Sequence, residues 1–197
     1  MSADPHVLAI CGSLREHSKT RTALREALDA AAESGATTEL LDLREYDLPP
    51  VNADDMAAGD ADALRERVAA ADAVLLGTPN YHGSYAAPLK NALDYCKRDQ
   101  FGGTTVGLLE VAGGSYPKPA LAHLRGVART LNAWTLPHEV GIPDSHETVG
   151  RDGITDPAIE RRVRELGEQL VEYAGVDRYP EMAEERGDQP AEATGRA

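Results

Sequence analysis

Two short segments of this sequence hold the side chains best suited to chemistry, and the first covers residues 12–20 (GSLREHSKT). It carries three hydroxyl groups and a guanidinium directly after a glycine, on Ser13, Ser18, Thr20 and Arg15. A tight turn that leads into a helix points backbone N–H groups at an anion, and the helix dipole adds to the attraction. Arginine can also donate two hydrogen bonds to phosphate oxygens. The segment therefore predicts a site for a terminal phosphate; capping of the helix by Ser18 or Thr20 is an alternative role compatible with it.

Neither of two common phosphate-binding motifs matches this segment. The pattern GxxxxGK[ST] needs a glycine where the chain has His17, and Lys19 comes one residue late. The dinucleotide pattern GxGxxG needs a second glycine where Leu14 stands. A monophosphate held by hydroxyl groups and one arginine fits better than either.

The second segment covers residues 78–84 (TPNYHGS) and follows an apolar run. It combines the amide of Asn80 with the ring of Tyr81 and the imidazole of His82. A flat heteroaromatic ligand needs an apolar wall and a few donors at its polar edge, and this mixture supplies both. Tyr81 as an ordinary surface tyrosine and His82 as an ordinary loop histidine remain the alternatives.

Apolar runs alternate with amphipathic stretches along the chain, which is typical of a parallel sheet with helices on both faces. Strands are predicted at residues 6–11, 37–43, 73–77, 104–111 and 134–140, and helices at 18–34, 60–71, 87–97, 119–132 and 156–175. In such sheets a ligand binds beyond the carboxyl ends of the strands, where the strand order reverses. Both segments follow predicted strands, so we expect them to meet at that edge.

Three motifs in this order resemble the NADPH-dependent FMN reductase family: Gly12-Ser13-Leu14-Arg15 with Ser18, Pro79-Asn80-Tyr81 with Ser84, and residues 89–94 (LKNALD). The resemblance extends from about His6 to Gly175 and implies a flavodoxin-like three-layer α/β sandwich with a five-stranded parallel sheet. It implies one FMN-binding domain over residues 1–176, followed by a flexible acidic tail over residues 177–197. Family members associate through the region of the third motif, which implies a homodimer or a homotetramer. Within that motif we expect Lys90 and Asp94 to pair on one helix face.

The resemblance also implies roles for single residues. The FMN phosphate is expected on Ser13, Arg15, Ser18 and Thr20, and the ribityl chain and flavin ring along Pro79, Asn80, Tyr81, His82, Gly83 and Ser84. Gly113, Gly114 and Ser115 are expected to close over the other edge of the flavin, with a simple turn as the alternative. Three positions depart from the family pattern: Thr20 and His82 stand where asparagine is frequent, and Asn80 where glutamate is frequent. His82 is the one candidate for an acid or base.

The implied activity is a ping-pong reaction in which NADPH or NADH reduces FMN and a small molecule then takes the electrons. A quinone, a flavin, an azo compound and a metal oxyanion all remain open as that acceptor. One alternative is a flavodoxin-like electron carrier without NAD(P)H activity of its own. A second is a flavin-free binding protein on the same fold.

The charge of the chain restricts its partners. It has 33 Asp and Glu against 20 Lys and Arg, a net charge of −13, which disfavours nucleic acid and anionic lipid. Lysine is scarce, which leaves open an ordinary acidic protein or one from a salt-rich, halophilic cytoplasm. The N-terminal residues do not resemble a secretory signal, and no run approaches the roughly 20 apolar residues of a membrane helix, so a cytoplasmic location is expected. Cys11 and Cys96 are predicted to be buried thiols, and no metal site is expected.

Overall fold

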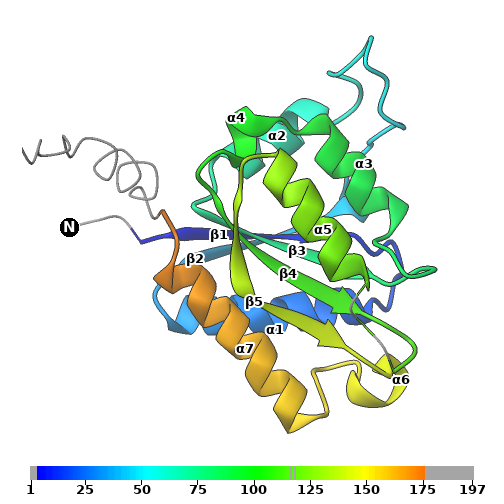
Figure 1. The fold of residues 1–197 in the computed structure, drawn as a ribbon, viewed down its shortest axis with the longest axis vertical. Coiled ribbons are helices and arrows are strands. Elements are labelled where there is room, and N and C mark those ends of the chain that lie inside the picture. The colour runs from blue at the N-terminus through cyan, green and yellow to red at the C-terminus, as the bar shows by residue number, and fades with distance from the viewer. Residues whose placement is uncertain (1–3, 116, 118, 176–197) are drawn as a thin grey trace, which may run out of the picture.

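The computed structural model describes residues 4–115, 117 and 119–175, and its centre is a five-stranded sheet (Figure 1). The strands are β1 (His6–Cys11), β2 (Thr37–Asp42), β3 (Ala73–Pro79), β4 (Thr105–Val111) and β5 (Trp134–Ile142). All neighbouring strands pair in parallel, in the order β2-β1-β3-β4-β5. The order therefore reverses between β1 and β3, and the loops that follow these two strands face each other at the switch point.

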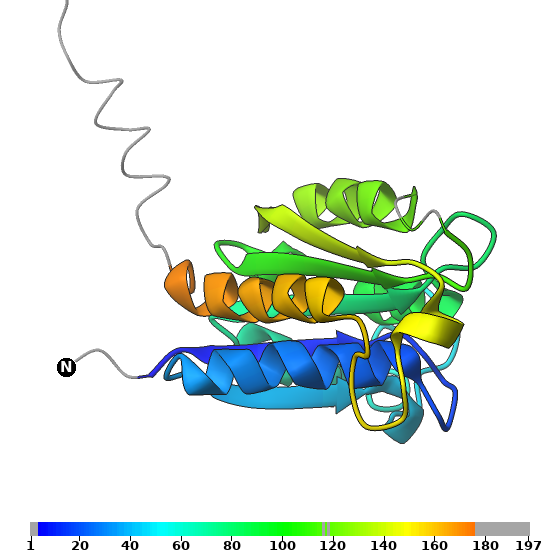
Figure 2. The ribbon, with the colours of Figure 1, turned by 90° about the horizontal axis from the view of Figure 1, so that it is seen from below.

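Helices cover both faces of the sheet (Figures 1 and 2). On one face lie α1 (Lys19–Glu33) and α7 (Pro157–Glu172). On the other lie α2 (Ala61–Ala69), α3 (Ala87–Tyr95), α4 (Arg98–Phe101) and α5 (Pro119–Thr130). Two short elements, η1 (Leu43–Glu45) and α6 (Ser145–Thr148), follow β2 and β5. This is the flavodoxin-like three-layer sandwich that the sequence predicts; the predicted tail at 177–197 lies outside the described residues.

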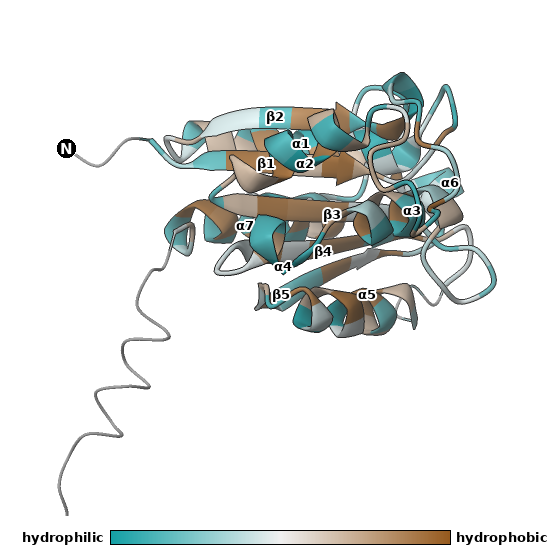
Figure 3. Cartoon of the chain, turned by 90° about the horizontal axis from the view of Figure 1, so that it is seen from above, coloured by the Kyte–Doolittle hydropathy of each residue, from teal (hydrophilic) through white to brown (hydrophobic). Residues whose placement is uncertain are grey.

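The three central strands, β1, β3 and β4, are apolar and buried on both faces, and Figure 3 shows their hydrophobic colouring. In β1, Leu8 and Ile10 pack into the core under α2 to α5, whereas Val7 and Ala9 pack under α1 and α7. All four side chains are at most 1% exposed. Two separate apolar layers thus hold the sheet rigid beneath the loops at its carboxyl edge.

The predicted elements are all present, and the differences are at their ends. The helix predicted at 87–97 ends at Tyr95, and the short helix α4 follows it. Strand β5 continues to Ile142, and α6 was not predicted because four residues carry no helical periodicity. Among the described residues, no helix has the length and apolar character needed to cross a membrane.

Candidate functional site

A cavity of about 220 Å³ lies at the switch point, between the loops that follow β1, β3 and β4. It brings residues from all three predicted segments together. They are Ser13, Arg15 and Thr20 from the first, Pro79, Asn80 and Tyr81 from the second, and Gly113 from the third. The cavity thus forms where the sequence predicted it.

The hydroxyl groups in this cavity have no partner within the described part of the chain. Ser13 and Thr20 are each only 2% exposed, yet neither side chain makes a hydrogen bond to another described residue. Their oxygen atoms open into the cavity and are not sealed in the core, so both hydroxyls are available to a polar ligand there. The exposed guanidinium of Arg15 lines the same cavity and also has no carboxylate partner among the described residues.

The first loop begins with a close backbone approach. The N–H of Gly12 donates to the carbonyl of Gly77 on β3, at 2.8 Å. A Cβ atom at position 12 would lie 2.7 Å from the Cβ of Leu89, so only glycine lets the chain pass here. This contact fixes the start of the loop against the neighbouring strand.

Ser18 serves as the N-cap of α1, because its hydroxyl accepts a hydrogen bond from the N–H of Arg21 at 3.1 Å. The capping role is therefore confirmed for Ser18, although this residue does not line the cavity at the switch point. Thr20 lies inside the first turn of the helix and does line it.

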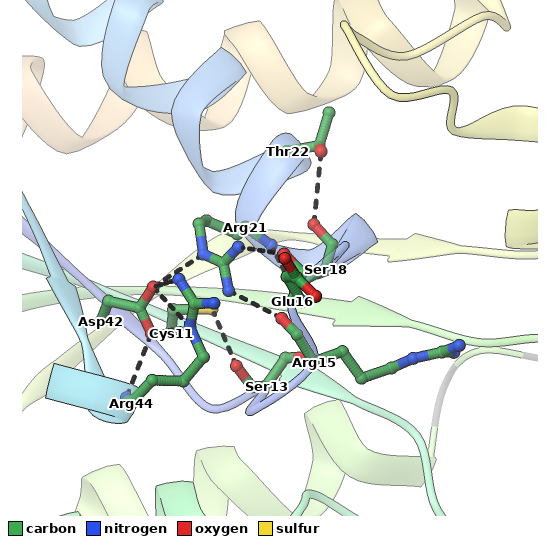
Figure 4. Close-up of polar contacts among 9 residues, drawn as sticks. All are labelled: Cys11, Ser13, Arg15, Glu16, Ser18, Arg21, Thr22, Asp42 and Arg44. Atoms are coloured by element: carbon green, nitrogen blue, oxygen red, sulfur yellow. Dashed lines mark hydrogen bonds and ion pairs between the residues drawn. The ribbon is translucent and has the colours of Figure 1, made fainter.

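Arg21 holds the first loop in place through several polar contacts, as Figure 4 shows. Its Nη1 and Nη2 donate to the carbonyls of Glu16 and Arg15, at 2.9 and 2.8 Å. Its Nε lies 2.8 Å from Oδ2 of Asp42 at the end of β2, as an ion pair without the alignment of a hydrogen bond. The side chain of Arg15 points away from this group, which leaves its guanidinium free (Figure 4). Sequence reasoning missed Arg21, since only its burial distinguishes it from the other helix arginines.

Asp42 is the acceptor on which two arginines converge. Besides Arg21, it binds Arg44 through Nε at 3.0 Å and Nη2 at 2.6 Å. Burial acts to raise the pKa of Asp42, but hydrogen bonds from Arg44 and the charge of Arg21 outweigh it and lower that pKa below its usual value. The carboxylate therefore stays ionised and keeps holding Arg21.

The second loop forms a tight hairpin from Tyr81 to Ser84, closed by two backbone hydrogen bonds of 3.0 and 3.1 Å. Its two central residues, His82 and Gly83, have φ values of 54° and 77°. Such a turn requires the left-handed conformation at both positions, and asparagine or glycine adopts it more easily than histidine. The side chain of His82 is exposed at the tip and does not line the cavity.

Hydrogen bonds of Asn80 and the buried Glu110 attach the second loop to the core. The amide of Asn80 donates to Glu110 and accepts from the N–H of Gly83 at 3.0 Å. Glu110 is fully buried and also accepts from the N–H of Leu121, at 3.2 Å, in the first turn of α5. Asn80 therefore lines the cavity with an amide that already has protein partners.

The remaining predicted residues lie at the rim or outside the cavity. Ser84 does not line it; its hydroxyl pairs with Nδ1 of His123 at 3.0 Å. Gly114 and Ser115 are exposed next to Gly113 and do not line it either.

Five lining residues were missed by the sequence reasoning: His17, Lys19, Val111, Ser145 and His146. The ammonium of Lys19 donates to the carbonyl of Ser145 and so connects α1 to α6. Burial, together with the charge of Arg15, lowers the pKa of Lys19. Lys19 could have been found as a second cation beside the hydroxyls, but Ser145 and His146 enter through α6, which had no sequence signal.

The described residues include no group of three or more side chains arranged to hold a metal ion. Cys11 and Cys96 are both buried, as predicted. Lys90 and Asp94 pair at 2.6 Å on α3, also as predicted. Neither the thiols nor this ion pair lines the cavity at the switch point.

The strand order, with a polar cavity at the switch point, defines a flavodoxin-like protein. The sequence profile of the NADPH-dependent FMN reductase family matches residues 5–147. An FMN-dependent NADPH-azoreductase of Staphylococcus aureus is 32% identical over 187 residues, covering 90% of this chain and 92% of that relative. The chain belongs to the NADPH-dependent FMN reductase family.

Solved structures show the same fold. The flavoenzyme NAD(P)H:(acceptor) oxidoreductase FerB of Paracoccus denitrificans superposes with a TM-score of 0.72, at 24% identity. That match covers 86% of this chain and 96% of FerB. An azoreductase of Bacillus anthracis superposes with a TM-score of 0.58 at 19% identity, covering 87% of this chain and 99% of the other.

Proposed function

We propose that this protein is an FMN-dependent oxidoreductase that takes electrons from NADPH or NADH and passes them to a small acceptor. The observation that carries the proposal is the cavity at the switch point, where the hydroxyls of Ser13 and Thr20, without partners among the described residues, lie beside Arg15 and Lys19. In a chain of net charge −13, two cations over such hydroxyls favour a phosphate group. Family membership supports FMN as the carrier of that phosphate.

The residues present fit FMN. Ser13, Thr20 and Arg15, which line the cavity, would hold the phosphate, and the N-terminus of α1 would add its dipole. Gly113 and the backbone of Pro79 and Tyr81 leave room for the ribityl chain and the flavin edge. The same proposal assigns Ser18 to the start of that helix and His82, Gly83, Ser84, Gly114 and Ser115 to the rim.

Bound FMN would supply the redox chemistry, exchanging two electrons with NAD(P)H and then with the acceptor. The protein binds and orients, and the buried floor of the cavity excludes water. Because one cavity serves both partners, they must occupy it in turn, which gives ping-pong kinetics. No side chain in the cavity has to act as acid or base in this scheme, and His82 points out of it.

Azo compounds are the acceptor class that the relatives favour, and quinones are a second class with similar properties. The Staphylococcus aureus relative is named an azoreductase, and it shares 32% identity over nearly the whole chain. Both acceptor classes are planar and take two electrons, so either can stack where the nicotinamide was. Tyr81 is 52% exposed beside the cavity and offers a ring for such stacking.

A homodimer would complete the site, and a homotetramer could be built from two such dimers. The cavity of about 220 Å³ is smaller than the roughly 300–1,000 Å³ of a typical small-molecule site, so one chain encloses only part of the cofactor. A more apolar groove of about 640 Å³ adjoins Leu14 and runs along α3. Leu14 and Val51 are exposed large apolar residues nearby, at 54% and 37%. The dimer predicted from the family would cover this surface.

The cellular setting is also a proposal. The family and the acidic composition support a cytoplasmic enzyme organised as one FMN-binding domain over residues 1–176, with residues 177–197 as an appended acidic segment. The excess of acidic residues and the scarcity of lysine support a halophilic host.

The visible spectrum of the purified protein with added FMN, recorded before and after anaerobic NADPH, tests the proposal. We expect a bound-flavin spectrum that bleaches on NADPH and recovers when a quinone or an azo dye is added. Bound flavin that neither NADPH nor NADH bleaches would favour the electron carrier. Folded protein that takes up no flavin would overturn the proposal.

A further inference from the structure

A second cavity, of about 370 Å³, lies on the outer side of the first loop. Residues from the first turns of α1 line it, together with Val149, Gly150 and Arg151 from the segment between α6 and α7. Figure 2 shows this segment passing close to the start of α1. His17 and Lys19 line both this cavity and the one at the switch point, so the two cavities adjoin across the loop.

This outer cavity is positively charged in an otherwise acidic protein. Arg25 and Arg151 line it, and neither forms an ion pair with any described residue. By contrast, five other arginines are paired with carboxylates at their own surfaces: Arg44, Arg65, Arg67, Arg125 and Arg164. Glu16 is the one carboxylate among the lining residues. Cations outnumber this single carboxylate in the lining, and neither Arg25 nor Arg151 is paired with it, so both guanidiniums are available to an anion.

The segment that carries Arg151 is held in place. The N–H of Gly150 donates to the carbonyl of Gly153 at 2.9 Å, and the N–H of Thr155 donates to Thr148 at 2.9 Å. Val149, at 3% exposed, packs into the core at the base of this turn. Arg151 therefore lies in a hydrogen-bonded turn near α1, and the buried side chain of Val149 anchors this turn to the core.

We propose that the outer cavity binds the 2′-phosphate of NADPH, through Arg25 and Arg151, and that it makes the protein prefer NADPH to NADH. The inference rests on the proposed function, which brings the nicotinamide to the cavity at the switch point. The other end of the dinucleotide then needs a site that adjoins this cavity. A phosphate dianion is the group on NADPH that NADH lacks, and two unpaired guanidiniums bind it well.

The direct test is calorimetric titration of the FMN-loaded protein with adenosine 2′,5′-bisphosphate, in parallel with adenosine 5′-monophosphate. Arg25→Gln and Arg151→Gln should each weaken the bisphosphate about tenfold, because each removes a charged hydrogen bond. The double variant should weaken it by about 100-fold. The monophosphate should change less than about twofold in every variant, as it lacks the 2′-phosphate.

Arg129→Gln is the matched control. Arg129 is an exposed arginine on α5, on the opposite face of the sheet, with no ion pair to a described residue. Its substitution changes the net charge by the same amount, so it should leave bisphosphate affinity unchanged. An equal loss of bisphosphate affinity in Arg129→Gln would show that only the net charge matters, and it would overturn the assignment of the outer cavity as the 2′-phosphate site.

Steady-state kinetics give the second measurement. We expect the KM for NADPH to rise about tenfold in Arg25→Gln and Arg151→Gln, with the KM for NADH unchanged. Equal KM values for both nucleotides in the natural protein, or variants that bind the bisphosphate normally, would overturn the proposal. A protein that holds FMN but oxidises neither nucleotide would refute the proposed function instead, while the calorimetry would still decide the phosphate site.

Discussion

Arg21 on α1 and Asp42 at the end of β2 lie 2.8 Å apart, from Nε to Oδ2, and both side chains are buried. Through this pair the loop that surrounds the phosphate site is attached to a strand that contributes nothing else to the cavity. The remaining nitrogens of Arg21 bind the carbonyls of Arg15 and Glu16, so this one side chain fixes the middle of the loop backbone.

Replacement of Arg21 by lysine should separate two contributions of this residue to FMN binding: the loop geometry that it fixes and its positive charge. Lysine keeps the positive charge near Asp42 but lacks the planar set of donors that reaches two carbonyls and a carboxylate together. We expect Arg21→Lys to weaken FMN about tenfold and to leave riboflavin, which has no phosphate, within about twofold. Fluorescence titration of the apoprotein with both flavins measures this. The control is Arg67→Lys, at an exposed pair with Glu39; an equal loss of both flavins in Arg21→Lys would indicate general damage to the fold.

Arg15→Ala should remove a direct phosphate contact. The guanidinium of Arg15 lines the cavity and is not used by any described protein group, so its loss leaves the fold intact. We expect FMN affinity to fall about 10- to 100-fold, as for a charged hydrogen bond, with a change in unfolding free energy below about 0.5 kcal/mol. Flavin titration measures the FMN affinity, and urea unfolding measures the unfolding free energy. Unchanged FMN affinity would remove Arg15 from the phosphate site.

His82→Asn tests whether this histidine acts in chemistry or only in the turn. Histidine at φ 54° is strained in the hairpin, whereas asparagine adopts that conformation readily. We expect the variant to be as stable as the natural protein or up to about 1 kcal/mol more stable, with the rate of flavin reduction within about twofold. Thermal unfolding measures the stability, and anaerobic stopped-flow experiments measure the rate of flavin reduction. A rate reduced about 100-fold would give His82 an acid or base role.

Neither thiol should react in the folded protein. Burial raises the pKa of Cys96 to about 12 and, although a hydrogen bond and Arg21 act against it, burial also raises the pKa of Cys11. Because the thiolate is the reactive form, both groups stay protonated and inert near pH 8. A disulfide reagent should label no cysteine under native conditions and both cysteines after unfolding in urea. Rapid labelling of the native protein would show that one of the two sites opens.

Stability should increase with salt. The chain has a net charge of −13, and salt screens the repulsion among its acidic residues. Screening should raise the melting temperature of the apoprotein up to about 0.3 M KCl, and adaptation to the salt-rich host that we propose should continue the rise, by several degrees in all, to about 2 M. Scanning calorimetry measures this, with a neutral osmolyte as the control. A melting temperature that levels off by about 0.3 M would indicate an ordinary acidic protein.

The sequence predicted the sheet, the five long helices and the place of the cavity because each rests on a strong local signal. Apolar runs buried on both faces identify the strands, and the hydroxyl-rich loop after the first strand indicates where the cavity lies. Contacts between distant residues could not be predicted in the same way. Arg21 with Asp42 and Asn80 with Glu110 join different strands and loops, and nothing in either local sequence names the partner. The short helix α6, which brings Ser145 to the cavity, lacks a periodic pattern altogether.

The order of the strands has one more consequence, through the position of β2 at the edge of the sheet. Strand β2 is exposed along its first residues and buried only near Asp42, so its backbone should exchange amide hydrogens before the central strands do. When this edge opens, Asp42 leaves Arg21 and the phosphate loop loses its anchor, although the rest of the sheet remains closed. The rate of cofactor release would then depend on how often β2 opens, although this strand does not contact the cofactor.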